Sequence, residues 1–141
     1  AAATFVAVNP AKRIGDANNA QRWADVSAIA DAYVTYLADN SGTAPTTTPS
    51  PTSGVTYAVA TTTGGTTLSA CEADTGNPTT TTLFVDLSAL VTGGYIGAIP
   101  KEPDYASGDI YQTGYYFYTD GSTYKVRSCA TYNTTNIEVI R

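Results

Sequence analysis

Histidine is absent from this 141-residue sequence, and cysteine occurs only at Cys71 and Cys129. Without histidine, a Ser–His–Asp or Cys–His catalytic system and a Cys/His zinc site cannot be assembled within the chain. The acidic residues Glu102, Asp104 and Asp109 are close enough in sequence for a glycosidase pair, but Asp beside Pro is ordinary turn chemistry. No glycine lies in a phosphate-loop motif. We therefore expect a protein that is not an enzyme and carries no cofactor.

Positive charge is also scarce, with seven Lys and Arg against twelve Asp and Glu and a net charge of −5. Binding a phosphate backbone requires clustered Lys and Arg, so this balance argues against a direct nucleic-acid site. Only 13% of the residues are charged, and the polar residues are largely Thr, Ser, Asn and Gly. This composition favours a secreted or cell-surface module over a cytosolic enzyme.

Long hydrophobic runs are missing as well, because no stretch of about 18 apolar residues could span a bilayer. Residues 1–8 are apolar but follow no charged region, so they do not have the pattern of a signal peptide. Their abrupt start predicts that they are the cut end of a longer segment.

Cys71 and Cys129 form no CxxC pair. A structural disulfide is the leading interpretation, and in an oxidising compartment it would stabilise the fold by about 4 kcal/mol. Two unrelated buried thiols are the alternative, because free cysteine is commonly buried.

The clearest pattern that is present is a helix over residues 16–40, with Asp16 or Asn18 as a candidate cap and residues 40–42 as a stop. Its apolar stripe, which must pack on something large, consists of Trp23, Val26, Ile29, Ala30, Tyr33 and Leu37. Its opposite face is assigned Arg22, Asp25, Asp31 and Thr35. Pro10 and Gly15 weaken helix over residues 1–15, a stub that should project from the domain.

After residue 43 the pattern changes to loops and short strands. The predicted elements are a strand at 55–60, a hairpin turn at 64–65 leading to a strand at 66–71, a helical turn at 87–91 that follows Asp86, a hairpin of 115–119 with 123–129 through Asp120–Gly121, and a strand at 136–140. Residues 1–141 therefore form one α+β domain, in which a long N-terminal helix packs on a small antiparallel sheet contributed by residues 41–141.

Two stretches of this sequence resemble type IV pilins and the pseudopilins of type II secretion. The first runs from Asn9–Pro10–Ala11–Lys12–Arg13 through the helix and ends at residues 39–42. The second includes residues 87–91, 94–96 and 99–104 and the tyrosine-rich hairpin 115–126. In that family a short helix, a glycine, a tyrosine and a proline-flanked acidic turn precede such a hairpin.

The resemblance implies a pilin-like fold and a structural subunit of an extracellular type IV pilus-like filament that supports adhesion, motility or DNA uptake. A secretion pseudopilin is the alternative. It further implies self-association through the N-terminal helix, with residues 1–8 as the tail of a segment that anchors the full-length precursor in the inner membrane before assembly. The residues assigned to packing in the filament or the core are Trp23, Val26, Ile29, Tyr33 and Leu37.

Two further features of the family bear on particular residues. Pilins often staple the outer domain with two cysteines near the C-terminus, which Cys71 and Cys129 match loosely because Cys71 lies in mid-chain. Major pseudopilins often hold calcium, for which the candidate ligands here are Asp104, Asp109 and Asp120. No Asp-x-Asp pattern with a closing Glu accompanies them, so solvated turn carboxylates are the alternative.

A function of another class is a free-standing secreted adhesin or carbohydrate-binding domain. Tyrosine offers a large, rigid contact area for such binding. The aromatic residues that could form the patch are Tyr111, Tyr115, Tyr116, Phe117, Tyr118 and Tyr124. Alternatively, every second member packs against the helix while the others face solvent or a neighbouring subunit.

Overall fold

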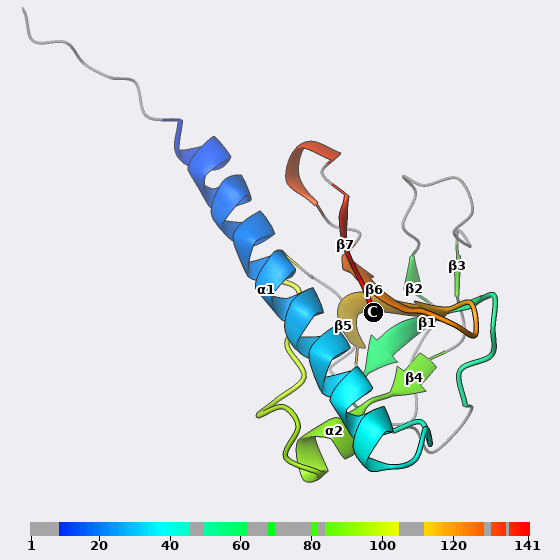
Figure 1. The fold of residues 1–141 in the computed structure, drawn as a ribbon. Coiled ribbons are helices and arrows are strands. Elements are labelled where there is room, and N and C mark those ends of the chain that lie inside the picture. The colour runs from blue at the N-terminus through cyan, green and yellow to red at the C-terminus, as the bar shows by residue number, and fades with distance from the viewer. Residues whose placement is uncertain are drawn as a thin grey trace, which may run out of the picture.

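One long helix lies across one face of a five-stranded sheet (Figure 1). This computed structural model describes residues 9–45, 50–61, 68–69, 80–81, 84–104, 112–128, 131–134 and 136–141. The elements are α1 Pro10–Asp39, β1 Val55–Ala60, β2 Leu68–Ser69, β3 Thr80–Thr81, β4 Phe84–Asp86, α2 Ser88–Thr92, β5 Gln112–Thr119, β6 Tyr124–Ser128, η1 Tyr132–Thr134 and β7 Ile137–Ile140. The predicted α+β class is confirmed. Within these ranges, no helix has the length and hydropathy needed to cross a membrane.

Helix α1 begins earlier than the sequence predicted. Asn9 is its N-cap and accepts a hydrogen bond at Oδ1 from the Lys12 N–H at 3.2 Å. Pro10 is the first helical residue, where its missing N–H removes no helical hydrogen bond. The predicted caps Asp16 and Asn18 therefore lie inside the helix, which spans 30 residues and, at 1.5 Å per residue, is about 45 Å long.

The predicted apolar stripe of α1 is confirmed over its C-terminal half. Its members Val26, Ile29, Ala30, Tyr33 and Leu37 are buried in the core with residues of β1, β5, β6 and β7. The Tyr33 ring lies 4.6 Å from that of Phe117 between centroids. The helix ends at its predicted stop, where the Gly42 N–H donates to the Leu37 carbonyl at 2.8 Å.

Two assignments at the start of that stripe were wrong. Trp23 is 41% exposed, whereas Arg22, assigned to the opposite face, is only 1% exposed. At about 100° of rotation per residue, position 22 lies one turn before Val26 on the core-facing line. Position 23 is rotated to the flank of that line, so Trp23 is not part of the core.

The sheet is mixed, with the strand order β4-β1-β5-β6-β7. Strands β5, β6 and β7 pair antiparallel as predicted, but β4 runs parallel to β1, so the purely antiparallel prediction was wrong. The hairpin expected between strands 55–60 and 66–71 was wrong too, because β1 lies between β4 and β5. The described part of 66–71, β2, pairs with β3 in a separate two-stranded sheet.

Two local predictions of the second half are confirmed. The helical turn predicted after Asp86 is α2, and Asp86 Oδ1 accepts from the Ser88 N–H at 2.9 Å. The hairpin through Asp120 joins β5 to β6, with Thr119 opposite Tyr124. In this turn the Asp120 carboxylate accepts hydrogen bonds from the Ser122 N–H at 2.8 Å and the Thr123 N–H at 2.7 Å.

These bonds predict how the β5–β6 turn responds to acid. The N–H groups of Thr123 and Ser122 and the Thr123 hydroxyl stabilise the charged carboxylate and hold the pKa of Asp120 below its usual 3.8. A depressed pKa in the folded state means that the turn's stabilisation is present above the unfolded pKa and is lost as pH falls through the folded pKa. Carbon-13 NMR of the Asp120 carboxyl should therefore give a midpoint below 3.8. The variant Asp120→Asn should lack this pH dependence of stability, and a midpoint at or above that value would contradict the assignment.

Candidate functional site: the Arg22 cluster and the groove beside α1

A buried arginine joins α1 to the loop that follows α2. The Arg22 Nε donates to Glu102 Oε1 at 2.5 Å, and its Nη2 donates to Asp104 Oδ2 at 2.6 Å. Its Nη1 donates to Asn19 Oδ1 at 2.8 Å. Burying a guanidinium is costly unless its donors have partners, and here each of the three nitrogens has one. We call Arg22, Glu102, Asp104 and Asn19 the Arg22 cluster.

The position of Glu102 is fixed by the start of β5. The Glu102 N–H donates to the Thr113 carbonyl at 2.8 Å, and the Thr113 hydroxyl donates to the Val59 carbonyl at 2.8 Å. The register between β1 and β5 shifts at this point, and Gly114 adopts a φ of 82°, a conformation that glycine reaches without strain. The irregularity in β5 thus presents Glu102 to the helix.

The charges of the cluster are unequally covered. Burial raises the pKa of the Glu102 carboxyl, and its hydrogen bond and ion pair with Arg22 oppose that rise. The Asp104 side chain, by contrast, is 59% exposed. Nearby, the Tyr115 hydroxyl donates to Asp25 Oδ2 at 2.5 Å, and burial is the main reason that the pKa of Tyr115 is raised.

On its other side, α1 is joined to the turn that precedes β7. The Asn19 side chain accepts from the Tyr132 N–H and donates to the Tyr132 carbonyl, both at 3.0 Å, in the manner of a backbone pair. The Tyr132 ring lies so close to Gly15 that a Cβ atom there would be 2.4 Å from its Cγ. Only glycine permits this contact.

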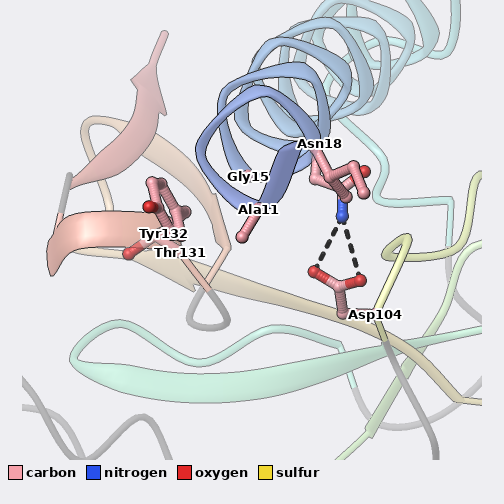
Figure 2. Close-up of a pocket in the computed structure, with 7 residues that line it drawn as sticks. Ala11, Gly15, Asn18, Asp104, Thr131 and Tyr132 are labelled. Carbon is pink, nitrogen blue, oxygen red and sulfur yellow. Dashed lines mark hydrogen bonds between the residues drawn. The ribbon is translucent and has the colours of Figure 1, made fainter. Parts of the chain in front are cut away.

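These contacts frame an open groove of about 410 Å³ along the N-terminal half of α1. Figure 2 shows Asp104 on one side below the helix, held by the Asn18 amide, and Tyr132 with Thr131 on the other side. The helix wall consists of the small residues Ala11 and Gly15, and Ile14 lies at the rim. Apart from Asp104 and Asn18, the lining is mainly apolar.

The predicted calcium ligands are not brought together where the structure describes them. Asp104 is engaged by Arg22 and Asn18, and Asp120 by its own turn, so the two share no partner. Asp109 lies outside the described residues. Over the described ranges, no three His, Cys, Asp or Glu residues are grouped as a metal site would require.

Other predicted groups have mixed outcomes. Cys71 and Cys129 lie outside the described residues, so their disulfide stays a prediction, and Tyr111 is outside them as well. Tyr115, Tyr116 and Phe117 are all buried, so their burial does not alternate along β5. Tyr118 and Tyr124 are partly exposed.

Sequence reasoning missed the Arg22 cluster and the groove. One signal was available for Arg22, which precedes Val26 by four residues and Ile29 by seven, the spacing of the core stripe. The partners Glu102 and Tyr132 carried no such signal, because their contacts with α1 join segments far apart in the sequence.

Removal of Arg22 should lower the free energy of unfolding, because the buried carboxylate of Glu102 loses its ion pair. Arg22→Met leaves Glu102 without its main partner, and we expect a loss of about 3–5 kcal/mol in the free energy of unfolding near neutral pH. Burial then raises the pKa of Glu102 with less opposition, so the folded state binds a proton that the unfolded state lacks. The deficit should shrink as pH falls from about 7 to 5, as measured by urea denaturation.

Two variants control this experiment. Arg22→Met with Glu102→Gln should recover much of the loss and show little pH dependence in the same range, because no buried carboxylate remains to titrate. Arg13→Met, at an exposed position of the same helix, should change the stability by less than about 0.5 kcal/mol. A deficit that grows on acidification would refute the assignment.

The contact between Gly15 and Tyr132 predicts that Gly15→Ala lowers the free energy of unfolding, whereas the same change in a helix ordinarily raises it. Gly→Ala inside a helix ordinarily stabilises by roughly 1 kcal/mol, but here the added methyl group would displace the Tyr132 ring. Gly15→Ala should therefore destabilise the protein by about 1–3 kcal/mol. In a Tyr132→Ala background the same change should instead stabilise it by about 0.5–1 kcal/mol, as measured by thermal and urea unfolding. A change in the free energy of unfolding of the same sign in both backgrounds would contradict the contact.

Comparison of the chain with protein-family models, curated proteins and solved structures gave no match. The Arg22 cluster has hydrogen-bonding and charge chemistry suited to holding segments together. The groove has an apolar wall and one exposed carboxylate suited to receiving another surface.

Proposed function

We propose that this chain is a structural subunit of an extracellular filament of the type IV pilus kind. In this proposal the subunits associate through their N-terminal helices, and the full-length form is anchored in the inner membrane before assembly. The mature protein is then a cell-surface component whose sheet faces outward. The same surfaces would serve a secretion pseudopilus, which differs in the length of the fibre.

The observation that carries the proposal is the projecting half of α1. Between Pro10 and Gln21 only Gly15 is buried, and this end of the helix extends past the strands (Figure 1). It meets the rest of the chain through Gly15, Asn18 and Asn19, which contact Tyr132 and Asp104, whereas most helix stability in proteins comes from packing of a whole face. A helix extended in this way is suited to packing against neighbouring subunits.

The exposed apolar side chains support the same function. Three large apolar residues are exposed in the described part of the chain, and two of them, Ile14 and Trp23, lie on α1. Ile14 is 62% exposed and borders the groove. Positions 14 and 23 lie on opposite flanks of the core-facing line, so neighbours on both sides of the helix could cover them.

The adhesin alternative has less support from the tyrosines of β5. A binding patch needs several aromatic faces open to solvent. Tyr115 and Tyr116 are buried and so unavailable to a ligand, and Tyr118 is partly covered with Lys125 Nζ 5.8 Å from its ring centroid. The described hairpin therefore offers little aromatic surface to a sugar.

Expression of the full-length gene in its native cells tests the proposal. Immunogold electron microscopy with antibodies to this domain should label surface fibres, and the gene should encode a hydrophobic segment and a prepilin-type leader upstream of Ala1. Because Trp23 is the sole tryptophan, its emission should move to shorter wavelength in fibres relative to dissociated subunits. Labelled cells without fibres and a gene without that segment would refute the proposal.

A matched pair of variants locates the assembly surface. Ile14→Lys should reduce fibre number by at least about tenfold, because it places a charge in an apolar contact. Thr35→Lys adds the same charge at an exposed position of the packed half of α1 and should leave fibres largely intact. Both purified domains should unfold within about 0.5 kcal/mol of the parent, which separates assembly from folding.

A further inference from the structure

We infer that the groove beside α1 receives the basic N-terminal end of α1 from a second copy of this chain, with Arg13 of that copy facing Asp104. The second copy is the adjacent subunit of the proposed filament, so the contact rests on that proposed function. The occupant follows from the distribution of charge, from the direction of the Arg13 side chain and from the chemistry of the groove wall.

The groove has a surplus of negative charge. The Arg22 cluster combines one guanidinium with two carboxylates, which leaves a formal charge of −1. Arg22 and Glu102 are sealed from solvent, so the surplus is presented by Asp104, which lines the groove. A positively charged group entering the groove would meet that exposed carboxylate.

One cation on α1 is available to it. The chain has seven Lys and Arg residues, and four of them form ion pairs with carboxylates: Lys12, Arg22, Lys125 and Arg141. Two others, Lys101 and Arg127, have other contacts. The Arg13 guanidinium has neither a hydrogen bond nor an ion pair within the described ranges, and it is exposed on the projecting end of α1.

Arg13 cannot occupy the groove of its own chain. Ala11 lines the groove, and two residues along a helix correspond to a rotation of about 200°, so Arg13 points away from that wall. Pairing of Arg13 with Asp104 is therefore intermolecular. The contact joins two different surfaces, a helix end on one copy and a groove on the next, and such heterologous contacts can repeat into open chains.

The groove wall suits an arginine in particular. Ala11 is small, so another side chain can approach the helix closely there, next to Gly15, which the Tyr132 ring already covers. The aliphatic stem of arginine packs on apolar surface while its planar guanidinium pairs with a carboxylate. Tyr132, whose ring packs on Gly15, lines the same space.

Photo-crosslinking in intact fibres tests the contact. A benzophenone amino acid in place of Tyr132 should give a crosslinked dimer, and mass spectrometry should place the second attachment within residues 9–13 of another copy. Arg13→Glu should reduce that crosslink about five- to tenfold, because it replaces attraction at an exposed pair with repulsion. Lys12→Glu, the same charge change one residue away, should reduce it no more than about twofold.

NMR of the isolated domain tests the contact without fibres. An excess of unlabelled parent chain, at about 1 mM, should shift the amides of Gly15, Asn18 and Thr131 in nitrogen-15-labelled Arg13→Glu, whose groove is intact. Unlabelled Arg13→Glu should produce less than about one fifth of that shift in the same labelled sample, and added salt should weaken the effect.

The outcomes separate this contact from the filament proposal. Fibres that form normally with Arg13→Glu, together with crosslinks to other residues or to another protein, would overturn the contact and leave the filament standing. Absence of fibres with the expected NMR shifts would refute the filament and support pairing between copies. Unshifted groove amides together with an unchanged crosslink yield in Arg13→Glu would overturn the contact.

Discussion

The position of α1 on the sheet depends on the buried guanidinium of Arg22. Its three nitrogens bond to Glu102, Asp104 and Asn19, so one side chain joins the helix to the loop before β5. Through Asn19 the same network reaches the backbone of Tyr132 before β7. Apolar packing alone would tolerate a helix shifted along its axis, since one hydrophobic contact resembles the next. A guanidinium is satisfied at one position only, so Arg22 fixes the register at the cost of its own desolvation.

Interactions between residues close in the sequence could be predicted, whereas those between distant segments could not. The stripe from Val26 to Leu37, the helical turn after Asp86 and the hairpin at Asp120 were predictable because each rests on residues a few positions apart. The parallel pairing of β1 with β4 joins distant segments and leaves no local pattern. The mixed sheet, with β2 and β3 set apart from it, could therefore not be derived from periodicity.

The site was less predictable than the fold, and charge explains why. Arg22 was assigned to the face opposite the stripe, although its spacing from Val26 matches the core stripe; charged residues are rarely buried, so the burial of Arg22 was not expected. A buried charge needs partners, and Glu102 lies 80 positions away in the chain. The predicted caps Asp16 and Asn18 were wrong. Both are good capping residues, but Asn9 followed by Pro10 begins the helix earlier.

The core-facing line of α1 is apolar after Arg22 and consists of small or polar residues before it, so the two halves of the helix pack differently. On its C-terminal side the line continues as Val26, Ile29 and Tyr33, which need burial and obtain it within the chain. On its N-terminal side it continues as Asn19 and Gly15, which meet Tyr132 and need no large apolar partner. The large apolar side chains of this part of the helix, Ile14 and Trp23, lie on its flanks, where the sheet leaves them exposed. Arg22 thus marks the boundary between packing that the chain completes alone and packing that neighbouring subunits would complete in the proposed filament.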